Sequence, residues 1–240
     1  FSKNLESNGV IVHWAKDAQE FNEIAYSILA EHNVKKLVKS KSMLTEECEM
    51  NKYLIAKGID VVETDLGERI LQLMNLKPAH IVVPAAHITR DEVGELFEKD
   101  GISKDIGNHD PTYLTQCARY SLRQEFIEAD AGMTGCNFGV ASTGDCVVCT
   151  NEGNADMSTS IPKLHIVSMG IDKVIPNYDA LAVFQRLLAR SATGQPSVSF
   201  TSQFRKARPG AEMHVILVDN GRSNIIADQL HWRTAKCIRC

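Results

Sequence analysis

The sequence has no apolar run long enough to cross a membrane and no secretory signal at its start. Its longest apolar stretch, Ile81 to Ile88, is interrupted by Pro84 and His87, whereas a membrane-spanning helix needs about 20 apolar residues. Basic residues do not predominate, because 26 Lys and Arg stand against 30 Asp and Glu and the net charge is −4. Nucleic-acid binding usually requires a basic face. These absences predict a cytoplasmic protein with no membrane span and no nucleic-acid partner.

Histidine spacings typical of a metal site are also missing. The sequence contains eight histidines, but none follow the HxxxH or HExxH pattern that places two imidazoles on one helix face. A histidine metal site is therefore not expected. The seven cysteines occur without a secretory signal, which favours reduced thiols over a disulfide framework.

Helical and strand-like patterns alternate along the first half of the chain. Asp17 is placed to cap one helix, and Thr45 a second helix that ends before Gly58. Strands separated by single helices require right-handed crossovers, so the predicted fold class is α/β with a mainly parallel sheet flanked by helices. An Asn-Gly pair at 220–221 is typical of a hairpin turn. Strand patterns lie at 36–38, 59–62, 79–83, 163–168, 198–203 and 213–219, and helical patterns at 17–31, 45–57, 66–74, 91–99, 111–129 and 177–191.

Two pairs of cysteines have the CxxC spacing. Cys237 and Cys240 follow the α/β pattern, and their spacing suits a zinc knuckle, a redox dithiol or the opening of a ferredoxin motif. Their place after a finished α/β domain favours a metal-binding appendage over a thioredoxin-like dithiol. Cys146 and Cys149 lie in an extended segment, where residues three apart point to opposite faces. These two are expected to be apolar fillers that bind no metal.

Several polar segments follow predicted strands. In a parallel sheet, ligands gather at the carboxyl ends of the strands, and helix N-termini favour anions. Such a site would use cationic, hydroxyl and amide groups, although the same residues are common in ordinary solvated turns. Glu152 is a candidate nucleophile or base, and an exposed turn glutamate is the alternative. The candidate ligand residues are Lys39, Lys41, Ser42, Thr143, Gly144, Asn151, Glu152, Thr193 and Gln195.

Six further segments stand out as a set: Val38-Lys-Ser-Lys-Ser-Met43, Glu63-Thr-Asp-Leu-Gly67, Ala129-Asp-Ala-Gly-Met-Thr-Gly135, Thr150-Asn-Glu-Gly-Asn154, Ser191-Ala-Thr-Gly-Gln195 and Val218-Asp-Asn-Gly-Arg-Ser223. Taken together, these segments and the final CxxC resemble the lactate-utilisation (LUD) family, specifically its iron–sulfur subunit. The resemblance implies a fold similar to ribose-5-phosphate isomerase and the CoA transferases, with a LUD-type domain at 1–230 and a ferredoxin-like domain beginning at 231–240. It also implies two 4Fe-4S clusters, with Cys237 and Cys240 as ligands, and a complex that oxidises L-lactate to pyruvate. The implied partners are a cysteine-rich subunit and a smaller LUD subunit.

The chain departs from the family pattern at its ends. It begins with Phe1 and stops at Cys240, so we interpret it as a fragment that lacks most of the ferredoxin-like domain. Two cysteines cannot assemble a cluster, and the fragment alone is expected to bind no cofactor and to be inactive. Two alternatives stay open: an isomerase- or CoA-transferase-like enzyme acting on a small anionic substrate, with Glu152 as nucleophile, and a docking domain with a vestigial pocket.

Overall fold

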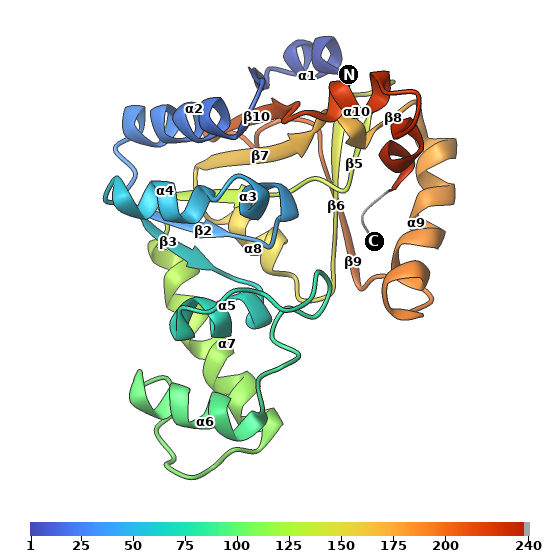
Figure 1. Ribbon diagram of the computed structural model, residues 1–240. Helices are drawn as coiled ribbons and strands as arrows, with labels where there is room; N and C mark the ends of the chain where they lie inside the picture. Colours follow the sequence, from blue (N-terminus) through green and yellow to red (C-terminus); the bar gives the residue numbers. More distant parts are fainter. Residues whose placement is uncertain (238–240) are drawn as a thin grey trace.

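The computed structural model describes residues 1–237 and contains two sheets (Figure 1). The larger sheet has six strands in the order β1-β10-β7-β4-β2-β3, and every neighbouring pair is parallel. The predicted α/β class with a mainly parallel sheet is confirmed. The six strands are β1 (Ile11–Ala15), β2 (Lys36–Lys39), β3 (Asp60–Glu63), β4 (Ala131–Thr134), β7 (Leu164–Gly170) and β10 (Glu212–Val218).

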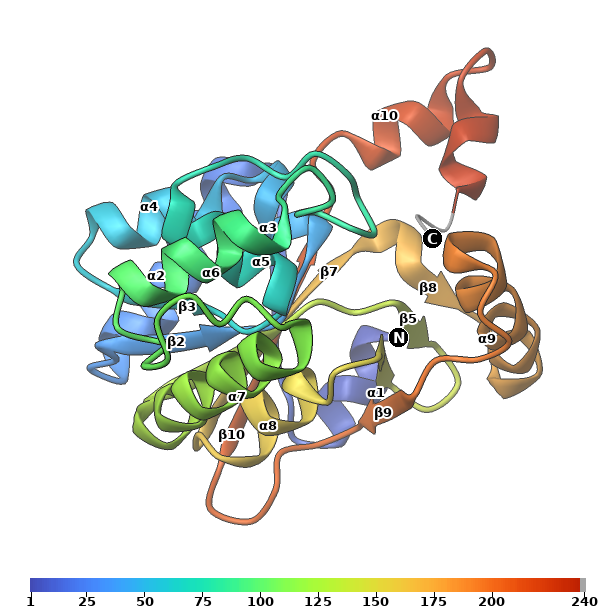
Figure 2. The ribbon, with the colours of Figure 1, turned by 90° about the horizontal axis from the view of Figure 1, so that it is seen from below.

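Helices cover both faces of the large sheet (Figure 2). Side chains alternate along each strand, so Leu37 of β2 joins the apolar cluster on one face while Val38 packs against the helix on the other. Burial of both faces explains why the central strands are apolar throughout. One face carries α2 (Ala18–Glu31), α3 (Met43–Glu47) and α4 (Met50–Ala56), and the other carries α1 (Ser2–Ser7), α7 (Pro111–Glu128) and α8 (Asn154–Ser160).

A smaller helical layer extends beyond the β3 edge of the sheet (Figure 1). It contains α5 (Leu66–Met74) and α6 (Arg90–Lys99), which pack with the first half of α7. Ile70, Phe97 and Leu114 form the centre of its own apolar cluster. This layer places the start of α5 directly after β3, at the carboxyl edge of the large sheet.

The second sheet has four strands in the order β8-β5-β6-β9. It is mixed, because β5 pairs antiparallel with β6 and parallel with β8. Leu181 and Leu188 of a long helix pack with Phe138 and Val147 of the sheet. The chain reaches this sheet from the carboxyl ends of β4 and β7, so the sheet stands beside that edge. Its elements are β5 (Phe138–Val140), β6 (Asp145–Thr150), β8 (Val174–Ile175), β9 (Phe200–Phe204) and α9 (Tyr178–Thr193), with η1 (Ile171–Lys173), α10 (Arg222–Ala227) and η2 (Trp232–Lys236) in the connections and tail.

The predicted strand at 79–83 is wrong. These residues form a loop that is closed by a hydrogen bond from the Ala79 N–H to the Pro84 carbonyl at 3.0 Å. Pro78 and Pro84 flank the segment, and proline lacks the N–H that a central strand needs. The apolar run is consequently exposed, with Ile81 at 53% and Val83 at 51%.

Two other local predictions need correction. The helix expected at 45–57 is two helices, α3 and α4, separated by a break at Glu49, whose φ is +49°. The residue that caps α3 is Ser42 and not Thr45, because the Ser42 hydroxyl accepts a hydrogen bond of 3.5 Å from the Thr45 N–H. Asn220 and Gly221 both have positive φ, at 42° and 84°, as the primed turn requires. The chain then continues into α10 and not into a strand. Within residues 1–237, no helix is both long and apolar enough to cross a bilayer.

Candidate functional site

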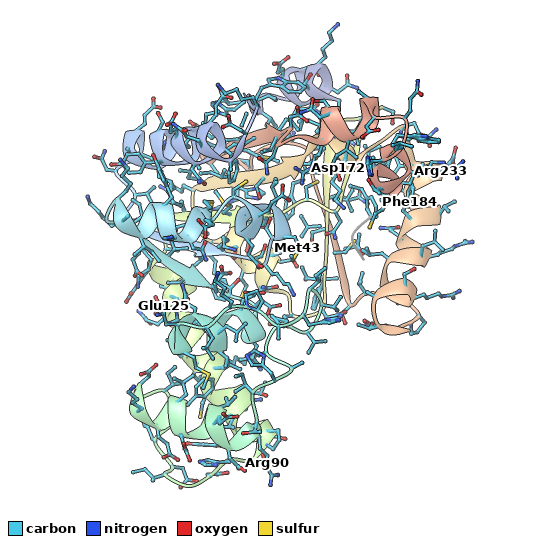
Figure 3. The ribbon with its side chains drawn as sticks, in the orientation of Figure 1. Met43, Arg90, Glu125, Asp172, Phe184 and Arg233 are labelled. Carbon is cyan, nitrogen blue, oxygen red and sulfur yellow. The ribbon has the colours of Figure 1, made fainter. Side chains whose placement is uncertain are left out.

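A cavity lies between the carboxyl edge of the large sheet and the four-stranded sheet, and is here called the edge pocket. Its lining comes from residues that follow β2, β3, β4 and β7, and from β6 and α9 opposite them. In Figure 3, Met43 and Asp172 lie on the large-sheet side, while Phe184 marks α9 on the other. Ligands of open parallel sheets bind outside the carboxyl ends of the strands, so the edge pocket is the place where a ligand is expected.

Six of the nine predicted ligand residues line the edge pocket and three do not. Thr143 and Gly144 belong to the turn between β5 and β6, where Thr143 donates a hydrogen bond to Asp145 and Gly144 lies against the backbone of Asn4. β6 has six residues, which separate this turn from the pocket end of the strand by about 17 Å. Lys39 is fully buried below the pocket. The six that line it are Lys41, Ser42, Asn151, Glu152, Thr193 and Gln195.

Three of these six already use their polar groups within the fold. The side-chain amides of Asn151 and Gln195 exchange two hydrogen bonds, at 3.0 and 3.1 Å, and the Asn151 oxygen also accepts from the Ser199 N–H at 3.0 Å. The Thr193 hydroxyl donates to the Ala189 carbonyl within α9. These contacts tie the end of β6 to the segment between α9 and β9, which indicates a structural role.

Lys41 and Ser42 present a cation and a hydroxyl at the end of β2. The Lys41 ammonium lies 3.4 Å from the Val82 carbonyl and 3.8 Å from the Glu68 carboxylate, and its side chain is 19% exposed. The Ser42 hydroxyl lies 3.3 Å from that of Ser168 on β7. A Cβ at Gly135 would lie 3.1 Å from the Ser42 oxygen, so glycine keeps this part of the pocket open. Lys41 is thus a cation whose charge faces the cavity without a short ion pair in residues 1–237.

Glu152 and Asp65 place two carboxyl groups at the N-terminus of α5. One Glu152 oxygen accepts from the Leu66 N–H at 3.1 Å, while Asp65 caps the helix by accepting from the Glu68 N–H at 3.1 Å. Glu152 is an exposed residue, as the turn-glutamate alternative expects. Loss of solvent around its carboxyl group and the adjacent Asp65 carboxylate nevertheless raise the pKa of Glu152 to about 7. A carboxyl group with such a pKa can gain or lose a proton near neutral pH, which suits a general acid or base.

A group of mostly buried charges, here called the lysine–glutamate cluster, includes Lys41 and extends behind it into the protein. The Lys39 ammonium lies 2.7 Å from Glu63, and the side chains of these two residues are 0% and 4% exposed. Burial and the neighbouring carboxylates Glu46 and Glu63 raise the pKa of Glu68 to about 7, and burial also raises the pKa of Glu46. In residues 1–237, one buried oxygen each of Glu46, Glu63 and Glu68 has no hydrogen-bond partner. The cluster consists of Lys39, Lys41, Glu46, Glu63 and Glu68.

The opposite side of the edge pocket contains a second group, here called the Arg222 cluster, which consists of Arg222, Glu47 and Asp172. Arg222 donates to Asp172 at 2.6 Å and makes two parallel bonds of 3.1 Å to Glu47. The side chains of Arg222 and Asp172 are 5% and 9% exposed, so this charge-assisted bond is well shielded from solvent, whereas the Glu47 side chain is 32% exposed. The paired carboxylates hold the pKa of Arg222 above its usual value despite burial. This cluster connects α3, η1 and α10.

Sequence reasoning did not select Asp65, Glu46, Glu68, Asp172 or Arg222 as site residues. Glu46 lies in the first turn of α3, where an acidic residue is common and indicates no site. Its burial depends on how α3 and α5 meet at the sheet edge, and no periodicity in the sequence encodes that meeting. A signal did exist for Arg222, because an arginine directly after an apolar strand and an Asn-Gly turn lies at the same sheet edge as Lys41.

The cysteines do not assemble a metal centre within residues 1–237. Cys146 packs in the apolar cluster on the α1 side, whereas Cys149 packs on the α9 side, as the strand alternation predicts. Cys237 is exposed, and Cys240 lies outside the described residues. A 4Fe-4S cluster needs four ligands, and no potential metal-binding group in the described part of the chain includes a cysteine. The described residues alone therefore do not fit an iron–sulfur cluster.

An open parallel sheet with helices on both faces and a pocket at its carboxyl edge is typical of α/β domains that bind small molecules. The model of one such family, the LUD domain, matches residues 1–220. The chain belongs to the LUD domain family.

Two curated relatives share this similarity along the whole chain. The chain is 42% identical over 247 residues to Lactate utilization protein B of Macrococcus caseolyticus, and 43% identical over 246 residues to that of Bacillus pumilus. Each alignment covers 100% of this chain and 51% of the relative, so the chain spans about half the length of these relatives. A solved structure of a DUF162 family protein from Deinococcus radiodurans is 13% identical, with a TM-score of 0.47 and coverage of 90% of this chain and 93% of that one.

Proposed function

We propose that this chain is the α/β domain of a lactate-utilisation protein, the iron–sulfur electron-transfer subunit of a complex that oxidises L-lactate to pyruvate. The observation that carries the proposal is the similarity, along the entire chain, to proteins named Lactate utilization protein B. In the whole protein, Cys237 and Cys240 would be the first ligands of two 4Fe-4S clusters. The other ligands would come from sequence outside the described residues. The partners would be a cysteine-rich subunit and a smaller LUD subunit.

Within that subunit, the edge pocket would bind a small carboxylate. Lactate and pyruvate each carry one carboxylate group, and Lys41 offers a cation at the pocket wall. Glu152, with a pKa of about 7, could donate a hydrogen bond to an anion while it is protonated. The Ser42 hydroxyl lies beside Lys41 and adds a further donor. This combination favours an anion over a neutral ligand.

A chimera tests the role in lactate utilisation. In Bacillus pumilus, this domain would replace the matching half of the resident Lactate utilization protein B, so that the resident second half supplies the remaining sequence. We expect the chimera to restore growth on L-lactate to a strain that lacks the resident gene. The purified chimera should contain about eight iron atoms per chain. Normal growth on lactate without any iron in the chimera would contradict the electron-transfer role, and failure of a folded, iron-loaded chimera would contradict the lactate role.

The alternative of an isomerase- or CoA-transferase-like enzyme depends on Glu152. Its carboxyl group faces the pocket and has a pKa of about 7, which would suit acid–base chemistry. A transferase would form a Glu152 thioester with acyl-CoA. We expect none, because one Glu152 oxygen is engaged by the Leu66 N–H and the Asp65 carboxylate adjoins the carboxyl group. Incubation with acyl-CoA followed by hydroxylamine and mass spectrometry decides this, and a modified Glu152 would establish the transferase.

A further inference from the structure

Three histidines and one glutamate meet at the amino-terminal edge of the large sheet, on the far side from the edge pocket. His32 follows α2, His13 lies in β1, and Glu212 and His214 lie in β10. The His214 Nε2 atom lies 2.6 Å from a Glu212 oxygen, and the His32 Nε2 atom lies 3.2 Å from the same oxygen. The absence of HxxxH spacing had predicted no histidine metal site. That inference missed this group because its members come from three elements that only the fold brings together.

The group has the composition and spacing of a zinc site. His32, Glu212 and His214 offer ligand atoms that all lie within 4.8 Å of one another. Two imidazoles and one carboxylate form a known catalytic-type zinc ligand set, and bond lengths near 2.1 Å in a tetrahedron separate ligand atoms by about 3.4 Å. Glu212 and His214 are two residues apart on one strand, so their side chains project from the same face. Small side-chain movements alone would bring the three ligand atoms to the separations that zinc requires.

Both ligand histidines are already oriented by their second nitrogen. The Nδ1 atom of His32 lies 2.8 Å from the Ile28 carbonyl oxygen, which can only accept, so Nδ1 carries the proton. The Nδ1 atom of His214 lies 2.9 Å from Nε2 of His13, which can accept a hydrogen bond from the Nδ1–H when His214 coordinates through Nε2. Zinc-bound histidines nearly always donate their other N–H to such a partner. Each Nε2 atom thereby faces the Glu212 carboxylate.

We propose that His32, Glu212 and His214 bind one Zn²⁺ ion and that His13 is a positioning residue for His214. The site opens onto a surface hollow that is also lined by Asp130 and Lys163, which leaves room for ion entry and for a water molecule as fourth ligand. Zinc bound there connects the end of α2 to β10 and so clamps the edge of the large sheet. The site is independent of Cys237 and Cys240 and of the proposed role in lactate oxidation.

Zinc titration of the 240-residue chain tests the proposal, with both C237S and C240S in every sample so that the CxxC cannot contribute. We expect one zinc per chain by calorimetry, and a tetrahedral Co²⁺ spectrum without a thiolate charge-transfer band. Zinc should also raise the melting temperature, because it binds only the folded state. His32→Gln or Glu212→Gln should weaken zinc binding more than about 100-fold, and His13→Gln about 10–100-fold. His32 and Glu212 lie at the surface, so both substitutions should leave the fold intact.

His231→Gln is the matched control, since His231 also contacts a carboxylate, that of Asp228, at 2.6 Å. It should bind zinc as the parent does. The proposal is overturned if the parent binds no stoichiometric zinc, or if His32→Gln binds zinc as tightly as the His231→Gln control.

Discussion

The Arg222 cluster and the lysine–glutamate cluster border the same pocket, and both bury carboxylates beside cations. In the Arg222 cluster, one guanidinium satisfies two carboxylates with three bonds of 2.6–3.1 Å. In the lysine–glutamate cluster, three carboxylates share two ammonium groups, and each carboxylate retains a buried oxygen without a hydrogen bond in residues 1–237. A planar guanidinium matches carboxylates in pairs, whereas an ammonium behaves as a point charge.

The difference indicates different roles for the two sides. A fully bonded cluster has one charge state and fixes the geometry of the elements that it joins. A cluster with surplus carboxylates contains a group that can bind or release a proton near neutral pH, as the pKa of about 7 for Glu68 indicates. Glu152, at the start of α5 on the same side of the pocket, also has a pKa of about 7. Residues with such pKa values are concentrated at functional sites. We therefore assign chemistry to the β2–β3 side of the pocket and structure to the Arg222 side.

The largest expected effect comes from removing Arg222. Arg222→Met leaves the carboxylates of Glu47 and Asp172 without their shared cation in a site where Arg222 is 5% exposed. Loss of one partner of a buried ion pair costs about 3–5 kcal/mol. Because the Glu47 side chain is 32% exposed and only Asp172 is well buried, the free energy of unfolding in urea should fall by about 3 kcal/mol, the lower end of this range. Arg90→Met is the control, since its side chain is 69% exposed beside Asp91 and should change stability by less than about 0.5 kcal/mol. Equal effects for the two variants would show that the Arg222 cluster is not a structural clamp.

The second prediction concerns pH. The pKa of Glu68 is raised from 4.5 to about 7 in the folded protein, so the folded state holds its proton more tightly than the unfolded state. Its contribution to stability is full below pH 4.5 and is lost as the pH rises through 7. Each pKa unit corresponds to about 1.4 kcal/mol, so the free energy of unfolding should decline by roughly 2–3 kcal/mol over this range.

Glu68→Gln should remove most of that decline. Glu46 and Glu152 keep their own contributions, because burial is the largest cause of the raised pKa of each. Urea unfolding at several pH values checks the slope, with exposed Glu31→Gln as the control. A slope identical in parent and Glu68→Gln would mean that Glu68 is ionised normally in the folded protein.

Local patterns predicted the fold better than the site. Helix α7 could be read from its apolar stripe, since Leu114, Ala118, Leu122 and Phe126 are the residues that it buries. The run at 79–83 was wrongly predicted as a strand because apolar β-formers between two prolines have the composition of one. Only hydrogen bonding to neighbouring strands distinguishes a strand from a loop. Lys41 could be predicted from its position after β2. The pKa of Glu68 could not, because it arises from elements that are distant in sequence.

The third prediction tests the pocket as an anion site. Lys41→Ala should weaken pyruvate binding about tenfold, since a bond to a charged group contributes about 1.5–3 kcal/mol. Lys52→Ala, at a side chain that is 82% exposed, is the matched control. Affinity should fall as the pH rises through about 7, where Glu152 ionises and repels a carboxylate, and Glu152→Gln should flatten that profile. Calorimetry measures both effects, and unchanged affinity in Lys41→Ala would exclude the lysine from the site.

The smallest expected effect separates the amide pair from the ligand site. Gln195→Ala removes two amide hydrogen bonds to Asn151 at an exposed position, and should lower the free energy of unfolding by about 0.5–1 kcal/mol. Because these groups are already paired with each other, pyruvate affinity should stay at the parent value. Gln19→Ala is the control, since Gln19 makes one exposed bond to Glu23 at 2.9 Å and does not line the pocket. If Gln195→Ala lost pyruvate affinity as Lys41→Ala does, the hydrogen bonds between Asn151 and Gln195 would have to open to admit the ligand. The division between a structural and a chemical part of the pocket would then be wrong.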